Sequence, residues 1–226
     1  MSTYPLSDED REIQERSRRF VDDELIPLEV EAEMNGGRIP AEARERHHRL
    51  AKELGLFAMN MPKELGGTGM TTLQQVLVSE QIGRVTNALG WCVHTPPQWA
   101  PAVVSKEQLE RWILPTIRGE AHECYAITEP GAGSDVDAIE ATARRDGEDY
   151  VLNGTKWHVT SYNTASYLFF QGKIADGPNA GSHAMFFVDK ETPGVVLVRA
   201  RVLAHVSRFT RDRRVPRRAG PGDEPR

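Results

Sequence analysis

The first 120 residues carry apolar side chains at the three- and four-residue spacing of helices. The first predicted helix begins after Ser7, a residue type that caps helix N-termini, and ends near Pro27, a helix breaker. Its predicted core face comprises Ile13, Ser17, Phe20, Val21 and Leu25. This pattern predicts that the first part of the chain consists of helices joined by connectors.

Three further helices follow from the same reading. The second opens at Pro40 and ends before Gly55, with a core face at Ala43, His47, Leu50, Ala51 and Leu54. Because adjacent residues point to different sides of a helix, we expect one of His47 and His48 to pack inside and the other to meet solvent. Thr71 caps the third helix, and Ser105 with Gln108 has the spacing of a capping box for the fourth.

Near residue 121 the period changes to that of short strands. Strands are predicted at residues 139–143, 149–152, 155–161, 165–172, 183–189 and 194–198, with turns at Asp146-Gly147 and Asn153-Gly154. Helices followed by strands indicate an α+β fold. We expect an all-helical N-terminal domain (residues 1–120), an antiparallel, barrel-like or sandwich β domain (residues 121–200) and a basic, disordered tail (residues 201–226).

The composition is that of a soluble globular protein, with 39% hydrophobic and 27% charged residues in 226. No apolar run reaches the roughly 18 residues of a membrane span, and no secretory signal opens the chain. Cys92 and Cys124 lie far apart and have no ligand-like spacing with histidines. We therefore expect free thiols, no metal site and a cytoplasmic location.

Charge is unevenly distributed along the chain. The segment from Arg199 to the end holds nine arginines and three acidic residues, a net charge of +6. Because the net charge of the whole chain is −5, the remaining residues carry −11. The acidic body argues against nucleic acid as a partner. The segment after Arg199 has no strand alternation and a disorder-like composition, so we interpret it as the product of a frameshift or of a truncated gene.

The segment Cys124–Asp135, which reads Cys-Tyr-Ala-Ile-Thr-Glu-Pro-Gly-Ala-Gly-Ser-Asp, carries the chemistry. Its glycines allow sharp turns and the close approach of a ligand to the main chain, and Thr128 and Ser134 add hydroxyls. Such a loop suits an anionic or heteroaromatic cofactor. We interpret Glu129 and Asp135 as residues that fix the turns of the loop and not as an acid–base pair.

These twelve residues resemble the signature of the acyl-CoA dehydrogenases, a family of FAD enzymes. Residues 64–69 (Glu-Leu-Gly-Gly-Thr-Gly), 80–84 (Glu-Gln-Ile-Gly-Arg) and 153–161 (Asn-Gly-Thr-Lys-Trp-His-Val-Thr-Ser) resemble further family segments in the same order. The resemblance covers roughly residues 5–198. The order of the helical and β domains also matches the family, whose members carry a C-terminal helical bundle after the β domain.

The resemblance implies a set of site residues. The FAD site would be lined by Tyr125, Ile127, Thr128, Gly133 and Ser134, and Ser134 would also meet the thioester substrate. Thr160 would bond the flavin ring near N5, where hydride is accepted. His158 stands where the family has Trp or Phe on the flavin, and strand alternation predicts that Trp157 points to the opposite face. His158 either alters the redox potential and the room for substrate, or fills the same packing role.

The implied activity is α,β-dehydrogenation of an acyl-CoA or similar thioester, with electrons passed to an electron-transfer acceptor. In the family the base that takes the α-proton is a glutamate of the C-terminal domain, which this chain lacks. No catalytic residue is therefore assigned, and we expect weak or no activity and poor assembly into the family's homo-oligomers. A flavin-dependent monooxygenase on the same scaffold and a non-catalytic fragment remain the alternatives.

Overall fold

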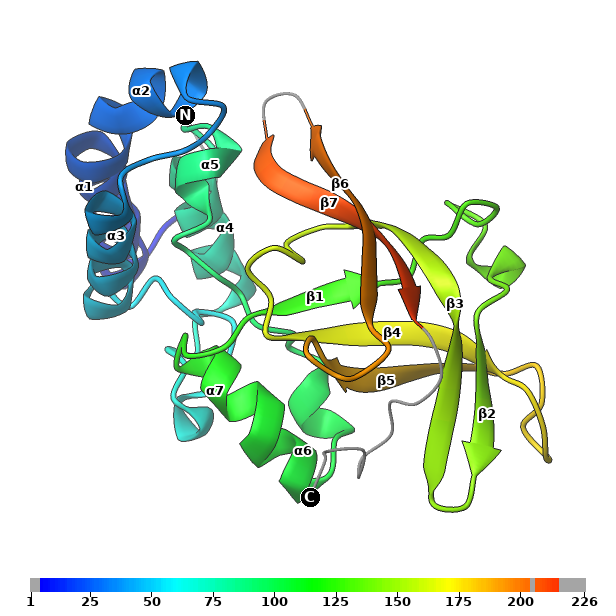
Figure 1. The fold of residues 1–226 in the computed structure, drawn as a ribbon. Helices are drawn as coiled ribbons and strands as arrows, with labels where there is room; N and C mark the ends of the chain where they lie inside the picture. Colours follow the sequence, from blue (N-terminus) through cyan, green and yellow to red (C-terminus); the bar gives the residue numbers. More distant parts are fainter. Residues whose placement is uncertain (1–4, 204–205, 216–226) are drawn as a thin grey trace. The chain divides into compact units, whose positions relative to one another are not determined.

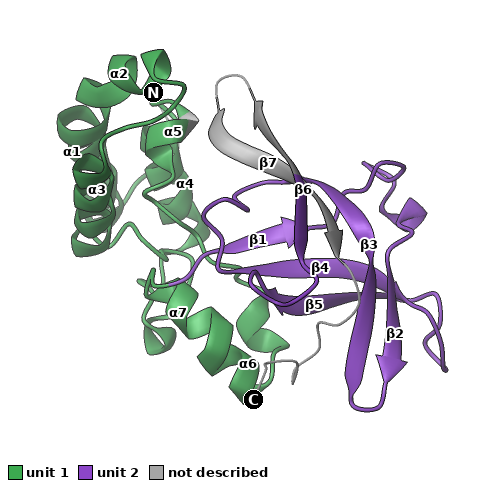
Figure 2. Ribbon diagram, in the orientation of Figure 1, with its two compact units in different colours: residues 1–120, 204–207 green, residues 121–203, 208–226 purple. Residues whose placement is uncertain are grey.

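The computed structural model describes residues 5–203 and 206–215 (Figure 1). The chain divides into two compact units, coloured separately in Figure 2. Of the described residues, the helical unit takes 5–120 and 206–207, and the β unit takes 121–203 and 208–215.

The helical unit contains α-helices interrupted by tighter and wider turns. The α-helices are α1 (Asp8–Phe20), α2 (Glu29–Met34), α3 (Ala41–Glu53), α4 (Thr72–Ile82), α5 (Asn87–Gly90), α6 (Lys106–Gln108) and α7 (Leu114–Ile117). The 3-10 turns are Ile26–Leu28, Lys63–Leu65 and Ala100–Ala102, and the π-helical turns are Val21–Leu25 and Leu109–Ile113.

All three predicted N-terminal caps are formed. The Ser7 hydroxyl accepts from the Asp10 amide at 3.1 Å, and the Asp10 carboxylate accepts from the Ser7 amide at 3.1 Å. Thr71 with Gln74 and Ser105 with Gln108 form the same reciprocal arrangement. The predicted stop at Pro27 is wrong, because Pro27 lies in the first turn of a 3-10 segment, where its missing N–H is tolerated, and the chain continues into α2.

The core of the helical unit uses the predicted stripe of α1. Ile13, Phe20, Val21 and Leu25 are at most 5% exposed and pack in one cluster that also contains Ala51 of α3. His47 is buried with its ring edge-on to Phe20, at 6.4 Å between ring centroids, whereas His48 is only half-buried. The expectation of one packed and one more exposed histidine is confirmed.

The β unit is a single open sheet of mixed direction. Its strands are β1 (Glu123–Ala126), β2 (Thr142–Asp146), β3 (Asp149–Val159), β4 (Tyr167–Ile174), β5 (His183–Asp189), β6 (Val196–Leu203) and β7 (Val206–Val215). Their order is β1-β4-β2-β3-β7-β6, with β5 also paired to β4.

The direction of these pairings corrects the expected antiparallel barrel. β4 runs parallel to both β1 and β2, because each of these connections returns to the sheet after other elements and not through a tight hairpin. The β2–β3, β3–β7 and β4–β5 pairs are antiparallel. Within the described strands the pairing is an open path that does not close into a barrel.

The two predicted turns around β3 have different outcomes. The hairpin is confirmed, since Asp146 pairs with Asp149 and Gly147 turns the chain with φ +67°. The turn at Asn153-Gly154 is wrong, because both residues lie inside β3. Gly154 is instead required by close packing, since a Cβ there would lie 2.5 Å from Cβ of Ala141.

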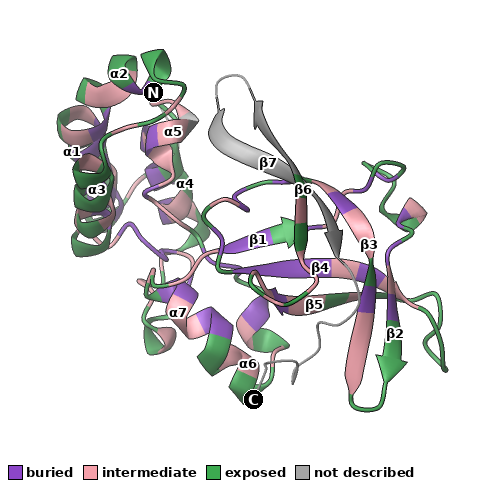
Figure 3. Ribbon diagram, in the orientation of Figure 1, coloured by how far each residue is buried: buried purple, intermediate pink, exposed green. Residues whose placement is uncertain are grey.

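Alternating side chains of β4 supply both faces of the sheet, and Figure 3 shows β4 as mostly buried. Leu168 and Phe170 join the core cluster with Cys124 and Ala126 of β1. On the other face, Phe169 packs 4.9 Å from Tyr125 between ring centroids. The same face carries Tyr167 and Phe187, whose rings lie 5.5 and 4.9 Å from that of Phe169.

The backbone after residue 200 forms strands where the sequence predicts none. β6 extends to Leu203, and β7 pairs with β3 in antiparallel register, with Gly154 opposite Val215. An edge of a long strand offers unpaired N–H and C=O groups to a neighbouring segment, whatever the composition of that segment. Residues 216–226 of the expected disordered tail lie outside the described residues.

Candidate functional site

The motif loop begins directly after β1 and folds into a tight turn. The amide of Glu129 donates to the carbonyl of Ala132 at 3.0 Å, and the amide of Ala132 donates back at 3.2 Å. Pro130 and Gly131 form the tip between them. A short 3-10 turn (Val136–Ala138) then leads towards β2. The loop is therefore held by its own backbone at one end.

Glu129 ties this turn to a second segment. Its side chain is 6% exposed, and its carboxylate accepts the amide of Glu140 at 2.7 Å and that of Ala141 at 3.0 Å. Both carboxylate oxygens point into the protein, where they accept hydrogen bonds from backbone amides and from a cationic side chain. The structure thus supports the interpretation of Glu129 as a residue that fixes the loop.

Lys156 of β3 is the cation, and the sequence-based reasoning did not single it out. Its side chain is fully buried; Nζ donates to Oε1 of Glu129 at 2.6 Å and to the carbonyl of Ile127 at 2.9 Å. Nζ also lies 5.1 Å from the ring centroid of Phe170. Burial lowers the pKa of Lys156, and the hydrogen bond and charge of Glu129 oppose that shift.

A signal for Lys156 was present in the sequence. Lys156 lies four residues after Leu152 in the same strand. Because side chains alternate between the two faces of a strand, both residues are placed on the core face. A lysine on a core face requires a buried acceptor or an anion. The assumed turn at Asn153-Gly154 concealed this relation, because it divided β3 into two strands.

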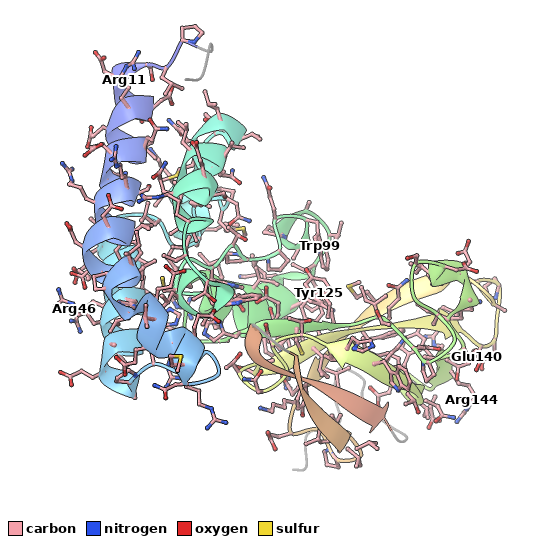
Figure 4. All side chains as sticks on the ribbon, turned by 90° about the horizontal axis from the view of Figure 1, so that it is seen from above. Arg11, Arg46, Trp99, Tyr125, Glu140 and Arg144 are labelled. Atoms are coloured by element: carbon pink, nitrogen blue, oxygen red, sulfur yellow. The ribbon has the colours of Figure 1, made fainter. Side chains whose placement is uncertain are left out.

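The predicted cofactor residues form the outer side of the loop and of the adjoining strand end. Ile127 and Thr128 are half-buried, whereas Tyr125, Gly133, Ser134, His158 and Thr160 are exposed. The Trp157 amide donates to the Thr128 carbonyl at 2.7 Å, which brings the loop and the end of β3 together. Tyr125 lies on β1, well apart from the Glu140 side of the loop in Figure 4.

The backbone at His158 departs from regular strand geometry. His158 has φ +50°, in the left-handed region, where the β3–β7 register also shifts between Lys156 and Val159. The rings of Trp157 and His158 meet edge-on, at 5.8 Å between centroids and 83° between planes. The expected opposite orientation of these two side chains is therefore wrong, because the bulge interrupts the alternation.

The glycines of the motif loop leave the main chain open to the close approach of a ligand, and they do not adopt backbone torsions that other residues avoid. Neither Gly131 nor Gly133 has a positive φ. A Cβ added to either residue would meet no atom within 4 Å, so both backbones border open space. Ser134, the residue after Gly133, is exposed, and so is Thr160 just after β3, whose hydroxyl donates to the His158 carbonyl at 3.5 Å. Such a surface fits a ligand with anionic or heteroaromatic groups.

The helical unit holds a separate pocket of about 370 Å³. Its wall combines apolar side chains such as Met59, Ile82 and Val93 with the hydroxyls of Ser79 and Thr95. A wall of this kind fits a small apolar group with one or two polar anchors.

Two negative findings apply to the described part of the chain. None of its helices has the length and apolar character that crossing a membrane requires. No three His, Cys, Asp or Glu side chains among residues 5–203 and 206–215 converge as a metal site would need.

Comparison with known families agrees with this geometry. Residues 7–120 match the family model "Acyl-CoA dehydrogenase, N-terminal domain", and residues 124–209 match "Acyl-CoA dehydrogenase, middle domain". The second match continues past residue 198, where the resemblance was expected to stop, and it covers the whole motif loop and β3.

Individual relatives cover almost all of this chain but only part of themselves. The bovine (Bos taurus) "Short-chain specific acyl-CoA dehydrogenase, mitochondrial" is 32% identical over 218 residues, which are 91% of this chain and 51% of that enzyme. The chain thus spans about half the length of the curated relatives it matches.

Two solved structures show the same fold with a flavin. A glutaryl-CoA dehydrogenase from Mycobacterium smegmatis in complex with FADH2 is 25% identical, has a TM-score of 0.76 and matches 94% of this chain and 53% of its own. An acyl-CoA dehydrogenase complexed with FAD from Bacillus anthracis is 26% identical with a TM-score of 0.77, over 99% of this chain and 38% of its own.

Proposed function

Because the chain belongs to the acyl-CoA dehydrogenase family, we propose that its β unit binds FAD and serves the α,β-dehydrogenation of an acyl thioester. One observation carries the proposal. The motif loop is held against the end of β3 by the bond from the Trp157 amide to the Thr128 carbonyl, while Ser134 of the loop and Thr160 just after β3 stay exposed.

The proposed FAD site has one wall from the end of β1 and the motif loop, and one from the end of β3. It comprises Tyr125, Ile127, Thr128, Gly133, Ser134, His158 and Thr160. When bound, the flavin supplies a hydride acceptor. The exposed hydroxyls of Ser134 and Thr160 would donate hydrogen bonds to the cofactor, and Ser134 would also meet the thioester.

His158 gives this site an imidazole in place of a larger aromatic ring. The His158 side chain is exposed, and its ring contacts the Trp157 ring edge-on. This contact holds the imidazole in place on a short, fixed stretch of backbone. A smaller ring leaves more room above the loop for a substrate. We propose that it packs on the cofactor and contributes less stacking area than an indole would.

Among the described residues we assign no base for removal of the substrate α-proton. By family resemblance that role belongs to a C-terminal helical domain, and the matched segments are the N-terminal and middle domains. We therefore propose that these 226 residues alone turn over weakly or not at all. None of the relatives named above supports the monooxygenase alternative.

Further assignments belong to the same proposal. We propose that the chain divides into residues 1–120, 121–200 and 201–226. The origin of the last segment by frameshift is tested by sequencing the locus past codon 199. An electron-transfer protein would be the acceptor, and assembly with further copies would be weak.

The test is a titration of the purified chain with FAD, in which the quenching of flavin fluorescence measures binding. Saturable one-to-one binding is expected, and S134A together with T160A should weaken it. A matched control is T192A, a threonine outside the loop and β3. Anaerobic addition of acyl-CoAs of different chain lengths should then bleach the bound flavin weakly or not at all, because no base for the α-proton is assigned among the described residues. If wild-type protein shows no saturable quenching, the proposal fails for this chain.

A further inference from the structure

The buried ion pair between Lys156 and Glu129 joins three segments that are distant in sequence. The lysine comes from β3, the glutamate from the motif loop, and the two amides that the glutamate accepts belong to residues 140 and 141. Both side chains are at most 6% exposed. Neither can therefore contact a ligand on the outer face of the loop, and their effect on one must be indirect.

The pair constrains the inner side of three successive loop residues. Nζ of Lys156 donates to the Ile127 carbonyl at 2.9 Å, and the Trp157 amide donates to the Thr128 carbonyl at 2.7 Å. Glu129 is held by its side chain and by its own backbone turn. Every inward acceptor of this stretch thus has a partner from β3 or from the turn. The outward hydroxyls and the bare backbone at Gly131 and Gly133 stay available.

A loop that is already fixed loses little conformational freedom when it binds a ligand, so more of the contact energy appears as affinity. Its donors are also placed before the ligand arrives. Surface ion pairs would not serve this purpose, because solvent and side-chain entropy weaken them. The Lys156–Glu129 pair is removed from solvent and has three fixed backbone partners.

Resting on the FAD site proposed above, we infer that Lys156 and Glu129 are positioning residues that preorganise the motif loop for the cofactor. They touch neither cofactor nor substrate. Removing the pair should leave the sheet folded while the loop becomes mobile and the FAD affinity falls.

The experiment compares K156M, the double variant E129Q/K156M and K173M. K156M leaves a buried carboxylate without its cation and is the variant that can fail to fold. The double variant removes both charges, and neutral replacement of a buried pair is often tolerated. K173M is the matched control, because Lys173 of β4 also donates to a carbonyl near the loop, that of Asp137 at 2.6 Å, but from a more exposed position.

Two readouts are taken at a temperature where each protein is folded by circular dichroism. The dissociation constant of FAD should rise at least tenfold in E129Q/K156M and stay within twofold of wild type in K173M. Hydrogen exchange without FAD should become at least tenfold faster for peptides that contain residues 129–132 and 140–141 in the double variant. Exchange of β4 and β5 should remain unchanged.

The outcomes separate the two proposals. Wild-type protein that does not bind FAD overturns the proposed function and, with it, this inference. If wild type binds FAD and E129Q/K156M binds it within twofold as tightly, the inference alone is overturned. Equal loss of affinity in K173M would also overturn it, because the effect would then not be specific to the buried pair.

Discussion

Gly154 of β3 lies so close to Ala141 that a Cβ on the glycine would stand 2.5 Å from the Cβ of the alanine and 3.0 Å from its Cα. Ala141 is 1% exposed and follows Glu140, the residue whose amide is bound by Glu129. The missing side chain of Gly154 therefore lets the segment after the motif loop pack onto the middle of β3.

The first prediction concerns this contact. G154A should lower the free energy of unfolding by about 1–3 kcal/mol, the usual cost of overpacking a core. Urea denaturation followed by circular dichroism measures the change. A fully stable G154A protein would contradict the close packing. The matched control is A141G/G154A, which exchanges the two side chains and should recover part of the loss.

The second prediction separates folding from binding at the loop. G133A should leave the unfolding free energy within about 0.5 kcal/mol of wild type, since a surface substitution away from special backbone geometry has little effect. Gly133 has no positive φ, and its added Cβ would touch nothing within 4 Å. The FAD dissociation constant should nevertheless rise, because the methyl group would occupy the approach to the main chain.

Fluorescence titration and thermal melting of the same G133A preparation provide both values. G131A, at the tip of the turn and with equally open surroundings, is compared in the same assays. A rise in the FAD dissociation constant for G133A alone would locate the approach at Gly133. If G133A binds FAD as wild type does, the cofactor does not approach the backbone at this position.

The third prediction concerns the ring at position 158. H158W should tighten FAD binding by about 2- to 10-fold, which corresponds to the roughly 0.5–1.5 kcal/mol of an aromatic pair. H158A should weaken binding and serves as the opposing control. An unchanged dissociation constant in both variants would place this side chain away from the cofactor. Melting temperatures of the two variants show whether the left-handed φ of 50° tolerates the change.

The fourth prediction concerns pH. Burial lowers the pKa of His47, and the nearby charge of Glu24 only partly opposes this shift. The unfolded chain, in which the histidine titrates near 6.5, therefore binds its proton more readily than the folded protein does. By linkage, stability is unaffected by His47 above this pH and falls as the pH drops below about 6.5.

Unfolding free energies measured between pH 7.5 and pH 5.5 test this sign. Wild-type protein should lose stability towards the acid end, and H47F should lose less, because its buried ring cannot take up a proton. H48Q is the control, since residue 48 is more exposed than residue 47. A wild-type slope equal to that of H47F would contradict the prediction.

Local physical chemistry accounts for what the sequence by itself determined. The N-terminal caps at Ser7, Thr71 and Ser105 and the stripe from Ile13 to Leu25 follow from hydrogen bonding and periodicity within a few residues. The hairpin at Gly147 follows in the same way from a turn residue between paired strands. The glycines and hydroxyls of the motif loop predict a cofactor site, and that assignment stays a prediction.

Only the tertiary structure decided the relations between distant segments. The parallel pairing of β4 with β1 and β2, the burial of Lys156 against Glu129 and the role of Gly154 against Ala141 each join residues more than ten positions apart. A local pattern cannot specify which segment completes a sheet edge or which anion meets a buried lysine. The bulge that turns His158 towards Trp157 arises in the same way, because strand register depends on the neighbouring strand and not on the strand alone.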